Sequence, residues 1–215
     1  MKYLFLFFLS LIFAADDNAP LNRTKDRQVD IKHIKINVSV DLKTKSVFGH
    51  VTHTLSPLKS ELKSFTLDGD DMIIRRVRMK DQDLDFNHYG NKIHIELPYA
   101  IGWYDTVDVR IDYSANPREG TYFFGPDEVY PKQPWQAWTQ GETEDNHHWV
   151  PIYDYPNERA TFETILTVDQ RFQAVSNGEL VSLKKNQNGT HTWHWRENFP
   201  MVAYLISFVV GEFEK

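Results

Sequence analysis

The stretch Ile34-Lys-Ile-Asn-Val-Ser-Val-Asp-Leu42 places an apolar residue at every second position, with polar residues between them. Successive side chains of a β-strand point to opposite faces, so this pattern predicts a strand with one buried face. The polar residues 43–46 predict a turn, and the alternation resumes over residues 47–55. The two runs therefore predict an antiparallel hairpin near the start of the fold.

Further runs typical of strands follow along most of the chain, and turn-forming residues separate most of them. They cover residues 64–68, 73–79, 92–97, 106–113, 161–169, 172–175, 192–196 and 203–212. No window carries an apolar stripe of helical period over three turns. Many short strands with regular turns predict an all-β sandwich, saddle or barrel.

The composition narrows the class of protein. The chain has 215 residues, no cysteine and a formal net charge of −6. This length suffices for one large β domain or two small ones, with a real core. The acidic balance argues against a nucleic-acid-binding protein, which usually carries a basic excess. Without cysteine there is no disulfide framework, no thiolate zinc site and no cysteine nucleophile.

The N-terminus predicts export. Lys2 is followed by an apolar run from Tyr3 to Ala15 and then by polar residues. A positive charge, a short apolar run and a small-residue exit are typical of a secretory signal peptide, here residues 1–15. An uncleaved anchor is the alternative, but the run is short for a transmembrane helix. We therefore expect a periplasmic, secreted or cell-surface protein without a membrane span after cleavage, and a linker over residues 16–27.

The segment 125–157 interrupts the strand pattern with five prolines and three tryptophans. Long connections of this kind often carry function. Trp135 and Trp138 could stack on sugars, but such aromatic residues more often pack a loop onto its own domain. Paired carboxylates could also hydrolyse glycosides, although a solvated loop is the simpler interpretation. The carboxylates of the segment's second half are Glu142, Glu144, Asp145 and Asp154.

The usual catalytic and metal motifs are absent from the sequence. There is no His-Glu-x-x-His, no phosphate-binding Gly-x-x-x-x-Gly-Lys and no Gly-x-Ser-x-Gly. His147 and His148 are adjacent, and in an extended chain adjacent side chains point in opposite directions. We therefore expect that these two histidines do not share a metal.

Three motifs together resemble the N-terminal domain of the zinc aminopeptidases, the family of aminopeptidase N and leukotriene hydrolase. They are Trp138-Thr-Gln-Gly-Glu142, His148-Trp-Val-Pro-Ile-Tyr-Asp-Tyr-Pro156 and Glu158-Arg-Ala-Thr-Phe-Glu163. The opening hairpin and the closing stretches 174–178 and 204–213 resemble the family as well, so the likeness covers about residues 28–213. Two positions depart from the pattern: Ile152 replaces a frequent cysteine, and His147 stands where a basic residue is common.

This resemblance implies a saddle-like, multi-stranded antiparallel sandwich over residues 28–213. It further implies the substrate-facing part of an exported zinc metallo-aminopeptidase, which hydrolyses N-terminal residues from peptides. In the family, a thermolysin-like catalytic domain follows this domain and holds the zinc. Because the motifs of that domain are absent from this sequence, we expect no catalytic residue and no bound zinc in this chain. The alternative is a non-catalytic cell-surface module that binds protein or carbohydrate.

The resemblance also assigns two substrate-binding residues. Glu142 matches the family glutamate that binds the free α-amine of the peptide, and Gln140 matches the glutamine that lines the pocket for the first side chain. An α-ammonium, with a pKa of about 7.7–8.0, needs an acceptor-only anion to hold it. Asp154, two residues before a proline, is expected to fix a turn by accepting hydrogen bonds from backbone amides.

Overall fold

The computed structural model describes residues 24–213, which form strands and two single-turn 3₁₀ helices. The predicted signal peptide and most of the predicted linker lie outside the described residues. None of the helices in the described part is long and apolar enough to cross a membrane. The elements are β1 (Val29–Asp41), β2 (Ser46–Pro57), β3 (Leu62–Asp68), β4 (Met72–Met79), β5 (Gln82–Asp83), β6 (Phe86–Tyr89), β7 (Lys92–Ile101), β8 (Val107–Ala115), β9 (Thr121–Phe124), β10 (Gln136–Thr139), η1 (Asn146–His148), β11 (Ala160–Asp169), β12 (Gln173–Ser176), β13 (Glu179–Lys185), β14 (Thr190–Met201), η2 (Ala203–Leu205) and β15 (Phe208–Gly211).

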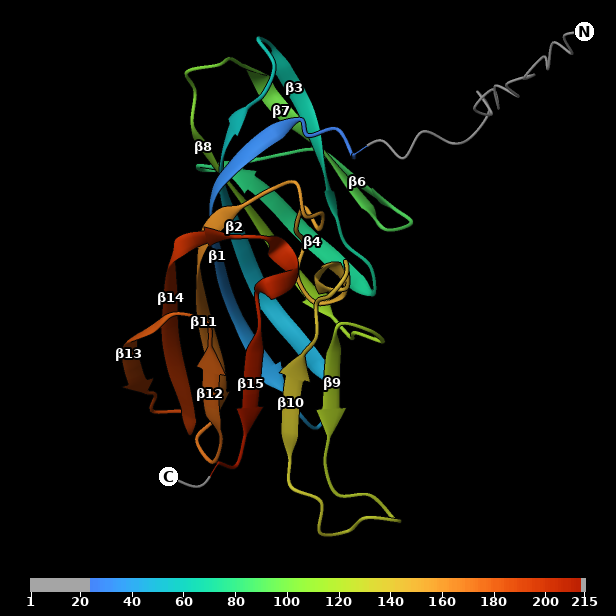
Figure 1. Cartoon of the computed structure of the whole chain (residues 1–215), viewed down its shortest axis with the longest axis vertical. Coiled ribbons are helices and arrows are strands. Elements are labelled where there is room, and N and C mark those ends of the chain that lie inside the picture. The colour runs from blue at the N-terminus through green and yellow to red at the C-terminus, as the bar shows by residue number, and fades with distance from the viewer. Residues whose placement is uncertain (1–23, 214–215) are drawn as a thin grey trace, which may run out of the picture.

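The strands form three sheets, which confirms the predicted all-β, multi-sheet fold (Figure 1). The large sheet has the order β13-β14-β11-β1-β2-β8-β4-β5. A four-stranded sheet, β12-β15-β10-β9, lies over its lower half in Figure 1, and a three-stranded sheet, β3-β7-β6, lies toward the upper end. The apolar faces of all three sheets contribute to one buried core.

The predicted hairpin forms as expected. Val38 pairs with Gly49 and Val40 with Val47, in an antiparallel ladder. Alternate residues of β1, including Ile36 at 0% exposure, point into the core. The strand predicted over residues 161–169 is also confirmed as β11, in which Phe162 is 1% exposed. The binary pattern thus determines which face of these strands is buried.

One pairing departs from the antiparallel pattern. β1 pairs with β11 in parallel, from His33 opposite Thr161 to Ser39 opposite Thr167. A parallel pair needs a long crossover, and here the chain between them contains β2 to β10. This pairing places the start of the domain against its C-terminal third, at the centre of the large sheet.

Other strands differ from the predicted ranges. The predicted strand 203–212 begins instead with η2, and only β15 is extended. β13 was not predicted because its sequence, Glu-Leu-Val-Ser-Leu-Lys-Lys, does not alternate, and all seven residues are exposed at the edge of the sheet. β10 lies within the proline-rich segment, where four residues are too few to give a periodic signal.

The Glu163 carboxylate, on the polar face of the large sheet, contacts two histidines, a lysine and an arginine. Glu163 is 6% exposed. Its Oε1 lies 3.3 Å from His33 Nε2 and 3.3 Å from Lys35 Nζ, while Oε2 contacts His194 Nε2 and lies 3.3 Å from Arg196 Nη2. Burial alone would raise the pKa of Glu163, but hydrogen bonds from His194, His33 and Lys35 lower it to about 2.

This cluster predicts acid sensitivity. Because the folded-state pKa of Glu163 lies below its ordinary value of 4.5, its stabilising contribution is complete above about pH 5 and is lost as the pH falls toward 2. We expect the free energy of unfolding, measured with urea across this range, to fall less steeply in Glu163→Gln than in the unsubstituted chain. Glu179→Gln, at an exposed position of β13, is the control. Equal pH slopes for Glu163→Gln and the unsubstituted chain would contradict this prediction.

Candidate functional site

The two residues assigned to substrate binding stand on a tightly anchored loop after β10. Gln140 and Glu142 are exposed, whereas Gly141 between them is buried. The Gln140 amide donates to Gly120 O at 3.0 Å, and the Asp145 amide donates to Gly141 O at 2.9 Å. A Cβ at Gly141 would lie 2.6 Å from both Asn146 Nδ2 and Tyr204 O. The loop therefore passes so close to its neighbours that only glycine fits there.

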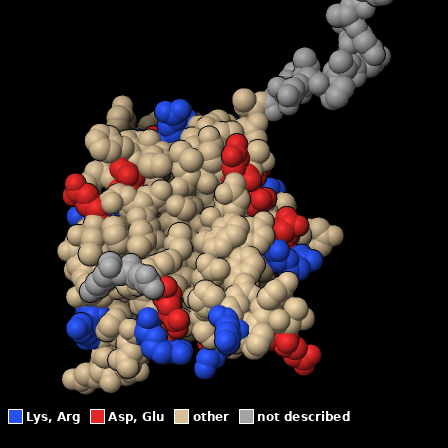
Figure 2. All heavy atoms as spheres, turned by 60° about the horizontal axis from the view of Figure 1, so that its bottom comes forward, with Lys and Arg blue, Asp and Glu red and all other residues tan. Residues whose placement is uncertain are grey.

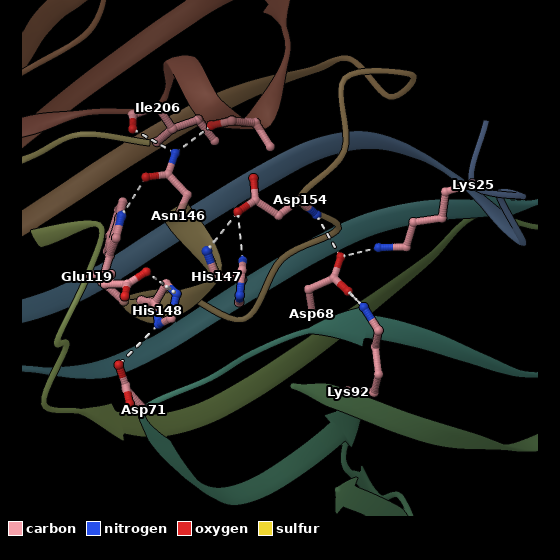
Figure 3. A network of polar contacts seen from close by, with 12 residues as sticks. Lys25, Asp68, Asp71, Lys92, Glu119, Asn146, His147, His148, Asp154 and Ile206 are labelled. Atoms are coloured by element: carbon pink, nitrogen blue, oxygen red, sulfur yellow. Dashed lines mark hydrogen bonds and ion pairs between the residues drawn. The ribbon is translucent and has the colours of Figure 1, made fainter. Parts of the chain in front are cut away.

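Asn146, in η1, holds this loop to the end of the domain (Figure 3). Its fully buried amide donates from Nδ2 to Ala203 O at 2.6 Å and to Ile206 O at 3.0 Å. Its Oδ1 accepts a hydrogen bond from Trp149 Nε1 at 2.7 Å. Trp149 is itself buried and packs edge-to-face on Phe208. One side chain thus joins the site loop, η2 and the core.

The side chains of Gln140 and Glu142 make no hydrogen bond or ion pair with any residue of the described part of the chain. Two hollows of the described surface lie elsewhere. One of about 560 Å³ is lined by residues 129–133, and one of about 460 Å³ lies between segments 39–43, 167–172 and 188–190. Glu142 is therefore an exposed carboxylate without a side-chain partner in the described residues.

Asp154 has the structural role expected for it. Its Oδ2 accepts hydrogen bonds from the His147 backbone amide at 2.9 Å and from His147 Nδ1 at 3.1 Å. Its own amide donates to Asp68 Oδ2 at 3.0 Å, and Asp68 forms ion pairs with Lys25 and Lys92 (Figure 3). Burial would raise the pKa of Asp68, but the two ammonium groups and the amide lower it below its ordinary range. This network fixes the position of Asp154 against η1 and the end of β3.

The extended conformation assumed for the histidine pair is wrong. His147 and His148 belong to the 3₁₀ turn η1 and not to an extended segment, so their rings stack with centroids 4.5 Å apart. His148 Nδ1 lies 3.1 Å from Asp71 Oδ2, and its Nε2 lies 3.7 Å from Glu119 Oε2.

Two sets of side chains around His148 have the composition of a metal site. One comprises Asp70, His147 and His148, and the other comprises Glu119, Asp145 and His148. Within each set the ligand atoms lie within 4.8 Å of one another. Sequence reasoning missed both sets because Asp70 and Glu119 come from distant loops, and no local spacing brings them to the histidines.

The tryptophans of the proline-rich segment pack onto their own domain, as expected. The Trp138 ring lies 4.8 Å from that of Tyr122 and 6.0 Å from that of Phe124, measured between centroids. Trp135 covers Gly125, where an added Cβ would lie 2.4 Å from the indole. These contacts leave both rings half-buried against their own domain.

An apolar row crosses the outer face of the four-stranded sheet. Val175 pairs with Val209, Val209 with Trp138, and Trp138 with Tyr122. Val175 is 43% and Val209 36% exposed. Figure 2, which brings the bottom of the molecule forward, shows a face whose middle carries few charged side chains, with Lys, Arg, Asp and Glu toward its margins. We refer to Tyr122, Trp138, Val175 and Val209 as the outer row.

Comparison with known proteins agrees with the motif resemblance. Leukotriene A-4 hydrolase of Xenopus laevis is 22% identical over 206 residues, which cover 91% of this chain and 34% of that protein. Leucine aminopeptidase 2 of Vanderwaltozyma polyspora is 22% identical over 189 residues, or 85% of this chain and 28% of that protein. This chain thus spans about a third of the length of these relatives.

The fold has a solved counterpart as well. An M1 zinc metallopeptidase from Deinococcus radiodurans, solved with a Tyr-Ser-Ala substrate, superposes with a TM-score of 0.76 at 20% identity. The likeness covers 87% of this chain and 43% of that one. The family model of the Peptidase M1 N-terminal domain matches residues 30–205. This match extends over most of the chain, and the protein therefore belongs to the Peptidase M1 N-terminal domain family.

Proposed function

We propose that this chain is the substrate-facing N-terminal domain of an exported zinc aminopeptidase that removes N-terminal residues from peptides. The observation that carries the proposal is Glu142, an exposed carboxylate without an ion-pair partner in the described residues, on a loop that Asn146 anchors. Membership of the M1 family and its zinc metallopeptidase neighbours support the reaction class. Export rests on the signal sequence predicted over residues 1–15.

In this proposal Glu142 accepts hydrogen bonds from the α-ammonium group of the peptide. A charge-assisted hydrogen bond of this kind contributes about 1.5–3 kcal/mol and discriminates against a blocked, uncharged N-terminus. Gln140, two residues earlier, offers both a donor and acceptors to the first residue of the substrate. The zinc ion and its ligands would come from a catalytic domain, which would supply the activated water.

The outer row is the surface that such a domain would cover. Exposed apolar side chains in a continuous row are typical of an interface with another domain. β15, the last strand described, belongs to the same sheet, so a domain that follows it in sequence would begin beside this row. Packing there would leave the neighbouring loop of Gln140 and Glu142 at the edge of the interface, where a pocket could be completed.

The test is the substitution Glu142→Ala in the full-length enzyme. We expect kcat/KM for peptides with a free N-terminus to fall about 10- to 100-fold, mainly through KM, because the lost interaction contributes about 1.5–3 kcal/mol. Glu144→Ala, an exposed neighbour without an ion pair in the described chain, is the control and should leave the kinetics unchanged. If Glu142→Ala behaves like Glu144→Ala, Glu142 does not bind the amine.

A further inference from the structure

We propose that Glu119, Asp145 and His148 form a binding site for a divalent transition-metal cation, with Zn²⁺ as the representative ion. All three ligands belong to this chain, so the inference stands independently of the proposed peptidase function. It departs from the expectation that this chain binds no zinc, which was drawn from the absence of the catalytic-domain motifs in the sequence.

The donor set fits such an ion. One imidazole nitrogen and two carboxylates are ordinary zinc ligands, and three protein ligands leave a position open for water. The ligand atoms lie within 4.8 Å of one another. Ligands at about 2.0–2.2 Å from a shared ion would lie somewhat closer together than this. Glu119 Oε2 lies 3.7 Å from His148 Nε2, and because its side chain is 67% exposed, it is free to adjust to a shared ion.

His148 is arranged as metal-binding histidines usually are. Its Nδ1 faces the Asp71 carboxylate at 3.1 Å, which fixes the ring and leaves the Nε2 lone pair facing Glu119 (Figure 3). Arg118 holds the other side of Asp71, donating from Nε to Oδ1 at 2.6 Å and from its amide to Oδ2 at 3.0 Å. A carboxylate behind the imidazole orients it and strengthens it as a ligand.

The Nε2 atom of His148 is available as a metal ligand. The residue is only 8% exposed, and no hydrogen bond to this nitrogen is formed within residues 24–213. This nitrogen therefore remains available to an ion that enters between His148 and Glu119. The carboxylates of Glu119, Asp145 and Asp71 outnumber the single cation, Arg118, in this cluster.

A glycine brings the two halves of the site together. Gly120 has φ +70°, and a Cβ there would lie 2.0 Å from the Asp145 carbonyl oxygen. The loop between β8 and β9 can therefore lie directly on the chain at Asp145, which places Glu119 beside it. A side chain at position 120 would keep the β8–β9 loop away from Asp145 and η1.

The second set, Asp70 with both histidines, shares His148 and is the structural alternative. In that set His147 Nδ1 is already bound to Asp154 Oδ2, together with the His147 backbone amide. His148 Nδ1 is bound to Asp71, so its free Nε2, which faces Glu119, can serve one set only. The contact with Glu119 favours the first set.

The experiment measures zinc binding to the purified chain without a histidine tag. After treatment with a chelator and its removal, Zn²⁺ is titrated in competition with a chromogenic chelator, and Mg²⁺ is titrated as the hard-cation comparison. We expect one Zn²⁺ per chain, at least about 10-fold weaker binding in Glu119→Gln and in His148→Gln, and no competition by Mg²⁺. Glu128→Gln removes the same charge from another exposed loop position and should bind zinc normally.

Glu119→Gln keeps the test valid if His148→Gln fails to fold, since Glu119 is on the surface. Circular dichroism of each variant shows whether the fold persists. The proposal is overturned if the chain binds no zinc in this competition, or if binding survives Glu119→Gln. Binding that is lost in Asp70→Asn but retained in Glu119→Gln would assign the ion to the second set and likewise reject the site proposed.

Discussion

Replacing Asn146 with alanine should lower the free energy of unfolding by about 3–5 kcal/mol. The substitution removes three buried hydrogen bonds at once. It leaves Ile206 O and Trp149 Nε1 without that partner, while Ala203 O keeps the hydrogen bond from the Ile206 amide at 3.0 Å. Each buried polar group left unsatisfied costs about 1–3 kcal/mol, and water cannot replace the amide unless the site opens. The effect should exceed that of most single substitutions in this chain.

Urea denaturation followed by tryptophan fluorescence measures this loss. Asn87→Ala is the matched control, because Asn87 is exposed in β6 and its side chain makes no hydrogen bond in the described chain. It should change stability by less than about 0.5 kcal/mol. Similar losses for the two variants would show that the amide of Asn146 does not anchor the loop.

The second large effect is expected for Gly178→Ala, at the turn between β12 and β13. Gly178 has φ +82°, and a Cβ there would lie 2.0 Å from Arg196 O and 2.5 Å from the carbonyl carbon of Arg196. An L-residue in the left-handed region costs about 1–2 kcal/mol, and the clash with the backbone of β14 adds about 1–3 kcal/mol. We therefore expect a loss of about 2–5 kcal/mol in the free energy of unfolding.

Gly189→Ala separates these two causes. Gly189, in the turn between β13 and β14, has φ +76° but no heavy atom within 4 Å of an added Cβ. It should lose only the conformational part, about 1–2 kcal/mol. The same urea titration on both variants gives the comparison. A Gly178→Ala variant as stable as Gly189→Ala would mean that the close approach to Arg196 is relieved at little cost.

Those parts of the fold that depend on local alternation could be predicted from the sequence. The hairpin of β1 and β2 follows from the apolar residues of one face, and the buried position of Phe162 follows from the pattern of β11. The exposed Gln140 and Glu142 were found by resemblance to a family, because no periodicity distinguishes them from other loop residues.

The rest depends on contacts between distant segments, which no local pattern encodes. A strand run indicates which face is buried but not which strand lies beside it, so the parallel neighbour of β1 could not be read from its residues. The conformation of the histidine pair was misjudged because one turn of 3₁₀ helix replaces extended chain, and Asn146 stabilises that turn through a partner in η2. Glu119 reaches His148 only because Gly120 permits the approach of two loops.

The parallel contact of β1 with β11 bears on how the molecule forms during synthesis. β1 ends at residue 41 and β11 begins at residue 160, so the hairpin of β1 and β2 leaves the ribosome long before the strand that completes its other edge. Until then that edge exposes unpaired amides and carbonyls, which other chains could capture. Closure between such remote segments is intrinsically slow, so the nascent chain would need protection from aggregation until most of the domain has been translated.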